Sequence, residues 1–169
     1  AFFIFLSCSS PKVENEREAN TGFQTIGSIE RLDSAVNSLI GSDAKIEVLA
    51  SGFEWAEGPL WLEGQQALIF TDVPTNTIWK WTEKDSLTLY FSPSGYLGDR
   101  SDKREPGANG LALDAFGNLI LCQHGERQVG KMLSTLDAPK AEFESLATGY
   151  DGKRFNSPND LVFNSKGQL

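Results

Sequence analysis

A repeat of about 50 residues restricts the fold of this chain more than any other feature. When Glu57, Asn109 and Asn159 are placed in one column, the segments EGPLWLEGQQALIF, NGLALDAFGNLILC and NDLVFNSKGQL align. The three column residues lie 52 and 50 positions apart. Each asparagine is followed by a glycine after eight residues and by a leucine after ten. A period of roughly 20–50 residues is typical of solenoids, propellers and repeat arrays.

Short apolar runs separated by Gly, Asn, Asp and Pro divide each repeat, which indicates many short β-strands. The runs that we expect as strands are KIEVLA, PLWLE, ALIFTDV, TIWKW, LTLYFS, GLALD, NLILC, FESLA and DLVF. Four short strands per repeat is the size of one propeller blade. The sequence therefore predicts an all-β fold, with residues 31–169 forming about two and a half blades of a larger β-propeller. We expect such an incomplete propeller to be inactive and poorly folded by itself.

The N-terminal residues have a different composition. The apolar run AFFIFLS has the character of the end of a signal segment, and FLSCSS resembles a bacterial lipoprotein cleavage box, in which Cys8 is lipidated. An ordinary cleavable signal peptide, with Cys8 incidental, is the alternative. Residues 9–30 are polar and predict a tether. Either reading of residues 1–8 predicts an exported protein of the bacterial periplasm or cell envelope, and the lipoprotein reading predicts that it is attached to the membrane only through a lipid.

Apolar residues at helical spacing between Ile29 and Ile40 predict one short helix near residues 31–40, with Gly41 as its stop. The net charge of the chain is −8 and its pI is about 4.7. A basic face is needed to bind phosphate, so this charge argues against a nucleic-acid partner.

The column residues have a chemistry of their own. If each repeat begins with its innermost strand, Glu57, Asn109 and Asn159 face one central channel at one depth. A carboxylate with carboxamide oxygens suits Ca²⁺ or Mg²⁺ and, less selectively, Mn²⁺ or Zn²⁺. Asn-Gly and Asn-Asp pairs also occur simply as turns, so the column is equally open to a purely structural role at the blade entrances.

Three phrases resemble a known family: FEWAEGPLW, ANGLALDAFGNLILCQHGERQV and DGKRFNSPNDLVFNSKGQL are similar to the gluconolactonase and regucalcin-like propellers. The resemblance runs from about Lys45 to the end of the chain. It implies a six-bladed propeller that hydrolyses sugar lactones with one divalent ion, most often calcium. It also implies that Glu57 binds the metal and that Asn159 points to the same centre, as a ligand or a substrate contact, while further ligands and the general base come from later blades.

Three more residues are candidates for contact with the sugar: Asn109, His124 and Arg154. A blade-start turn for Asn109, a structural histidine and a surface arginine are the alternatives. The function that we expect is metal-dependent hydrolysis of a sugar lactone, and other esters or organophosphates are related possibilities. A non-catalytic propeller that binds a sugar or a protein at its channel mouth is the rival hypothesis, and an acidic Glu57 at a blade entrance favours the enzyme.

Overall fold

The computed structural model describes residues 22–99 and 105–169. The chain divides between Val48 and Leu49 into two compact units, each of which is described by itself. Cys8, the predicted signal segment 1–8 and most of the predicted tether lie outside the described residues. No helix in the described part of the chain is long and apolar enough to cross a membrane.

The first unit contains one small sheet and one short helix. Strands β1 (Gln24–Thr25) and β2 (Glu47–Val48) pair antiparallel. The regular helix predicted near residues 31–40 is not confirmed, because only a five-residue 3-10 helix, η1 (Ser34–Ser38), is present. No described part of the chain covers the apolar face that was expected for the helix, since Leu32 is 87 % and Leu39 83 % exposed. A helix of this length depends on such packing for its stability.

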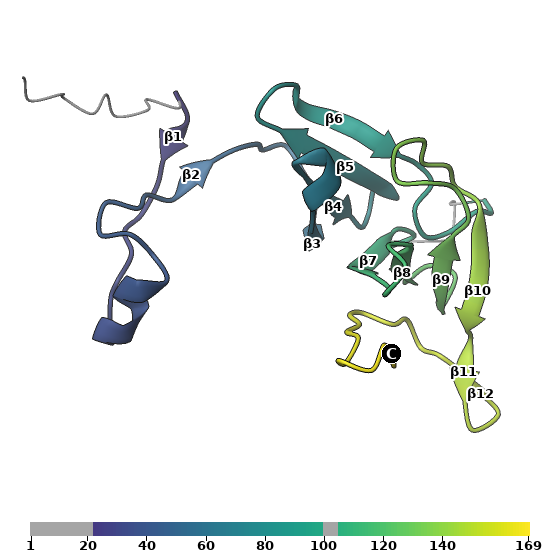
Figure 1. The fold of residues 1–169 in the computed structure, drawn as a ribbon. Coiled ribbons are helices and arrows are strands. Elements are labelled where there is room, and N and C mark those ends of the chain that lie inside the picture. Colours follow the sequence, from purple (N-terminus) through teal and green to yellow (C-terminus); the bar gives the residue numbers. More distant parts are fainter. Residues whose placement is uncertain (1–21, 100–104) are drawn as a thin grey trace, which may run out of the picture. The chain divides into compact units, whose positions relative to one another are not determined.

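The second unit contains two four-stranded antiparallel sheets in which each strand pairs with the next along the chain (Figure 1). This is the order expected of consecutive propeller blades. The first sheet comprises β3 (Ala56–Leu62), β4 (Ala67–Asp72), β5 (Thr77–Thr82) and β6 (Ser86–Phe91). The second comprises β7 (Ala108–Leu113), β8 (Leu119–Gln123), β9 (Gln128–Met132) and β10 (Phe143–Ala147). The prediction of an all-β fold with four strands per repeat is confirmed.

The hydrophobic core lies between these two sheets. The side chains of Ile69 and Ile78 from the first sheet and of Leu119 and Leu121 from the second are fully buried in one cluster. Burial of each such side chain stabilises the fold by roughly 1.5–3 kcal/mol. The edge strands β3 and β7 lie next to each other (Figure 1), so the beginnings of the two repeats meet in space.

The remaining elements are short: η2 (Glu63–Gln65), β11 (Gly149–Tyr150) and β12 (Lys153–Arg154). The run DLVF, expected as a strand, forms none. A strand needs a ladder partner, and the described residues provide no second strand for it, unlike β4 for β3 and β8 for β7. The turn that follows is nevertheless formed, because Asn164 N–H donates to the Gln168 carbonyl as Asp114 N–H does to that of Asn118 in the second repeat.

Candidate functional site at the blade entrances

The three column residues are brought together by close backbone contacts between successive repeats. A Cβ atom on Gly58 would lie 2.3 Å from the carbonyl oxygen of Asn109. In the same way, a Cβ atom on Gly110 would lie 3.0 Å from the carbonyl oxygen of Asn159. The backbone of each column residue therefore abuts the repeat before it, although about 50 residues of sequence separate them.

Hydrogen bonds fix this arrangement. The hydroxyl of Thr71, on β4 opposite Glu57, donates to the carbonyl of Asn109 at 3.1 Å. The amide of Gly110 donates to the carbonyl of Asn159 at 2.8 Å. The first contact joins the first repeat to the second, and the next joins the second repeat to the third. The blade entrances are thus tied together through the backbone, which leaves the column side chains free for other partners.

The first strand of each sheet is irregular at the column. The pairing of β3 with β4 shifts register between Glu57 and Leu60, and the pairing of β7 with β8 shifts between Ala108 and Leu111. Gly58 lies within the first of these irregularities and has φ +51°. β-bulges are common beside active sites, where they redirect a side chain. The two sheets therefore share a distortion at the same position of the repeat.

Glu57 is half-buried, and its carboxylate is held by a neighbouring indole. The Nε1–H of Trp55 donates to Glu57 Oε1 at 2.7 Å. Trp55 is in turn fixed by its backbone, because its amide donates to Asp72 Oδ1 at 2.9 Å and its carbonyl accepts from the Val73 amide at 3.1 Å. Asp72 is only 2 % exposed. A buried carboxylate therefore anchors the segment that presents Glu57.

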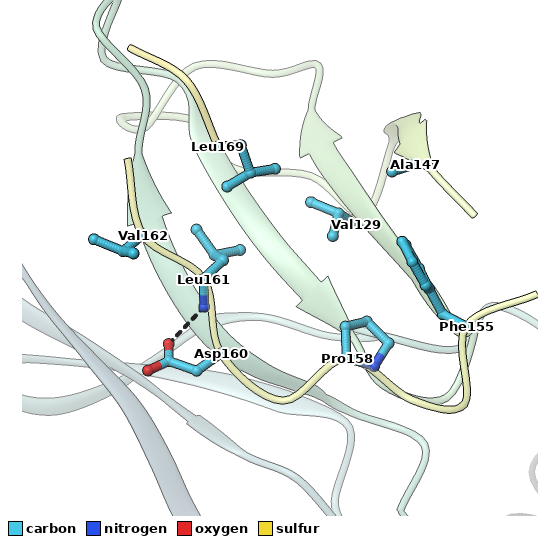
Figure 2. Close-up of a pocket in the computed structure, with 8 residues that line it drawn as sticks. All are labelled: Val129, Ala147, Phe155, Pro158, Asp160, Leu161, Val162 and Leu169. Atoms are coloured by element: carbon cyan, nitrogen blue, oxygen red, sulfur yellow. Dashed lines mark hydrogen bonds between the residues drawn. The ribbon is translucent and has the colours of Figure 1, made fainter. Parts of the chain in front are cut away.

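The two asparagines have different surroundings. Asn109 is 2 % exposed, and its carboxamide makes no hydrogen bond with any part of the chain that the structure describes. Asn159 is exposed and follows Ser157, whose φ of +109° is unusual for a residue with a side chain. Backbone strain of this kind costs of order 1–3 kcal/mol and often marks functional sites. Asp160, the next residue, accepts the Leu161 amide at 2.8 Å (Figure 2).

His124 directly follows β8, and Arg154 is the last residue of the short strand β12. His124 Nε2 is 3.2 Å from Glu105 Oε2, and its Nδ1 is buried without a hydrogen-bond partner among the described residues. Arg154 donates to the carbonyl of Glu126 at 2.6 Å. No hydrogen bond among residues 22–99 and 105–169 joins Arg154 to the column, so the structure ties this arginine to the β8–β9 turn instead.

The donor set of the column fits a hard cation only in part. No group of three or more His, Cys, Asp or Glu side chains that could hold a metal ion occurs in the described residues. The column instead offers one carboxylate and two carboxamides, and the buried Asn109 amide lacks a partner within the described chain. Oxygen donors of these types are ligands of Ca²⁺ and Mg²⁺. The residues present therefore fit part of an oxygen-donor shell.

A cavity of about 640 Å³ lies beside the third repeat, lined by Val129, Ala147, Phe155, Pro158, Asp160, Leu161, Val162 and Leu169 (Figure 2). Its lining is mostly apolar. The repeat places Leu161 and Leu169 at the positions of Leu111 and Leu119, both of which are buried between the two sheets. The cavity is thus the counterpart of the core between blades, and the column lies outside its lining apart from the neighbouring Asp160.

The Asp160 carboxylate affects the pKa of a cysteine in the second sheet. Burial, followed by the nearby Asp160 carboxylate, raises the pKa of the Cys122 thiol to about 12. Cys122 is fully buried on β8. A thiol with this pKa stays protonated at neutral pH and is a poor nucleophile.

Trp55 and Asp72 were not among the residues predicted from the sequence. The spacing Trp55-Ala56-Glu57 could have indicated the indole contact, because residues i and i+2 of a strand point to the same face. No comparable signal in the sequence identifies Asp72, since its partners come from a segment 17–18 residues away.

Consecutive four-stranded antiparallel sheets, with an oxygen-rich column where their first strands meet, define the class as blades of propeller type. The family model described as SMP-30/Gluconolactonase/LRE-like region matches residues 55–169. The chain therefore belongs to this family, and the resemblance noted in the sequence is confirmed.

Individual relatives agree with this assignment. The gluconolactonase of Zymomonas mobilis is 33 % identical over 152 residues, which are 89 % of this chain and 42 % of the relative. The solved gluconolactonase of Xanthomonas campestris is 29 % identical, with a TM-score of 0.63, over 80 % of this chain and 40 % of that one. Virginiamycin B lyase of Staphylococcus aureus shares only the fold, at 15 % identity and a TM-score of 0.50, over 76 % of this chain and 38 % of that one. The chain spans about two fifths of the length of each.

Proposed function

We propose that the protein to which this chain belongs hydrolyses the ring ester of a sugar lactone with the help of one divalent ion. The observation that carries the proposal is Glu57, a half-buried carboxylate at a blade entrance whose orientation is fixed by Trp55. Family membership and gluconolactonases at 29–33 % identity support the reaction class. The matched part covers 42 % of the length of the Zymomonas mobilis relative. If that part holds about two and a half blades, as the repeat predicts, the same spacing over the full length of the relative gives about six blades.

Glu57 and Asn159 are the residues that would hold the ion. Ca²⁺ suits these oxygen donors best, and Mg²⁺, Mn²⁺ and Zn²⁺ are the alternatives. When bound, a divalent ion supplies Lewis-acid polarisation of a carbonyl and a lower pKa for water. The general base is a carboxylate that we assign to a later blade, outside this chain.

The sugar would be oriented by groups around the column. The carboxamide of Asn109, which makes no hydrogen bond with the described residues, can both donate to and accept from hydroxyl groups. His124 Nδ1, which has no hydrogen-bond partner among the described residues, is a second candidate for contact with a hydroxyl group. Arg154 can contact the sugar only if its guanidinium breaks its hydrogen bond to the Glu126 carbonyl. We therefore rank Arg154 below Asn109 and His124 as a sugar contact.

We further propose that the protein is exported and held in the cell envelope through a lipid on Cys8. The support is the sequence around Cys8, which resembles a lipoprotein cleavage box. Labelling of the expressed protein with a fatty-acid analogue, compared with Cys8→Ser, tests this point separately from the enzymatic proposal.

The test of function uses the full-length protein and D-glucono-1,5-lactone. We expect hydrolysis to stop after chelation, to return with added metal, and to fall more than about 100-fold in Glu57→Gln, because several kcal/mol of charge stabilisation depend on the ion. The carboxamide that Glu57→Gln introduces can still accept from Trp55, so the unfolding midpoint should not change. Glu63→Gln is the matched control, because Glu63 accepts from Trp61 at the same 2.7 Å on an exposed turn.

Other outcomes would lead elsewhere. Tight metal binding without turnover of any lactone would direct attention to other esters. Absence of metal binding in the full-length protein would contradict the proposal and would favour a propeller that binds a sugar or protein without catalysis.

A further inference from the structure

We propose that Trp55 is a positioning residue for the metal ligand Glu57: its indole N–H occupies Oε1 and thereby leaves Oε2 as the oxygen that faces the ion. This inference rests on the proposed function, because it concerns the same carboxylate. It adds a residue that acts through the ligand and makes no contact with the substrate.

The hydrogen bond has the properties that such a role requires. It is 2.7 Å long, within the range of bonds to an ionised acceptor. The indole nitrogen is a donor only, so it pairs with a lone pair of Oε1 and fixes which way the carboxylate is turned. Partners of this kind orient the ligands of metal sites, and their loss typically costs about 10–100-fold in metal affinity.

The neutrality of the indole also matters. An arginine or lysine in the same place would orient the carboxylate but would offset its negative charge and repel a cation. Among the described residues, neither ion pair involves Glu57, since the pairs are His124 with Glu105 and Lys131 with Glu144. Trp55 therefore orients Glu57 and leaves its full charge for the ion.

The donor is itself held in place. The amide of Trp55 donates to the buried Asp72, and its carbonyl accepts from Val73. Both anchors belong to the end of β4, which pairs with β3 at Ala56 and Glu57. A rigid strand end thus positions the indole, and the indole positions the carboxylate.

The chain contains a matched pair that separates this role from simple packing. Trp61 Nε1 donates to Glu63 Oε2 at 2.7 Å with the same Trp-x-Glu spacing. The two indoles are almost equally exposed, at 43 % for Trp55 and 44 % for Trp61. Glu63 lies in η2, at the other end of β3 from the column. Removal of either indole should therefore affect folding similarly, and only Trp55 should affect the column.

The experiment is a titration of the full-length protein with Tb³⁺, an oxygen-seeking luminescent ion, in wild type, Trp55→Phe, Trp61→Phe and Glu57→Gln. With Tb³⁺ excited directly, we expect Trp55→Phe to weaken binding about tenfold or more, Trp61→Phe to leave it within about twofold, and Glu57→Gln to abolish it. With the indoles excited instead, emission at saturation should fall in Trp55→Phe and not in Trp61→Phe, because energy transfer requires an indole close to the ion.

The outcomes distinguish this inference from the proposed function. Equal affinities in wild type, Trp55→Phe and Trp61→Phe, together with loss in Glu57→Gln, would overturn the role of Trp55 and leave the metal site standing. Absence of binding in wild type, or full binding in Glu57→Gln, would overturn both. Unfolding midpoints in urea show whether Trp55→Phe is folded; if it is not, Trp55→Tyr, which keeps an aromatic ring without the N–H, provides the same comparison.

Discussion

Gly58 offers the sharpest test of how the blade entrances meet. Its backbone has φ +51°, and a Cβ atom at this position would lie 2.3 Å from the Asn109 carbonyl oxygen and 3.3 Å from Gly110 Cα. Both neighbours belong to the backbone of the next repeat, so neither can move aside as a flexible side chain would. Gly58→Ala should therefore push β3 away from β7 at the column.

The expected cost follows from two separate terms. The left-handed conformation costs a non-glycine residue about 1–2 kcal/mol, and forcing a methyl group into a packed contact costs about 1–3 kcal/mol. Gly58→Ala should thus lose about 2–5 kcal/mol of unfolding free energy. A native domain has only about 5–15 kcal/mol, so the variant should be clearly less stable.

Three other glycines separate the cost of the left-handed conformation from the cost of the close contact. Gly117 has φ +80°, and no atom lies within 4 Å of the place that a Cβ atom would take, so Gly117→Ala should lose only about 1–2 kcal/mol. Gly110 has the close contact without the strained φ, and Gly110→Ala should lose about 1–3 kcal/mol. Gly64 has neither, and Gly64→Ala should change stability by less than about 1 kcal/mol.

The assay is urea unfolding of the full-length protein with a common m-value. The predicted order of loss is Gly58, then Gly110 and Gly117, then Gly64. If Gly58→Ala were no more destabilising than Gly117→Ala, the close approach of β3 and β7 at the column would be refuted, and with it the argument that successive repeats bring the column residues together.

Two further predictions concern titratable groups. Despite the opposing effect of burial, hydrogen bonds from Asn118 and Phe116 lower the pKa of Asp114. Its ionisation stabilises the turn above the unfolded pKa of about 3.9 and ceases to do so as pH falls through the lower folded value, so the urea midpoints of wild type and Asp114→Ala should approach each other below about pH 4. Cys122, with its pKa raised to about 12, should resist iodoacetamide at pH 8 until urea unfolds the chain, as peptide mapping can show.

The repeat made most of the fold predictable. Strand positions could be derived because each apolar run is bounded by turn residues, and a turn permits only a few backbone conformations. The two well-matched copies even share their turn chemistry: Asp114 Oδ1 accepts the Phe116 and Asn118 amides, and Asn164 Oδ1 accepts those of Lys166 and Gln168. Gly117 and Gly167 both have positive φ at the same place in the turn.

The errors arose where local pattern and tertiary context disagree. Leu32 and Leu39 have helical spacing, but spacing predicts a helix only when something covers the apolar face. The run DLVF has strand character, but a strand also requires a hydrogen-bonded neighbour. Asp72 is a related case, because its hydrogen bonds come from amides that precede β3, and no local pattern identifies them.

The third repeat shows what the glycines after the column are for. Asp160 follows Asn159 where Gly58 and Gly110 follow the earlier column residues, so the third repeat carries a side chain at this position. Asp160 Cα lies 2.9 Å from where a Cβ atom of Gly110 would be, and its Oδ1 lies 2.5 Å from that point. Each glycine therefore makes room for the repeat that comes after it. The distance between column residues is set by the absence of a side chain one position later, and this is how residues about 50 positions apart can contribute to one site.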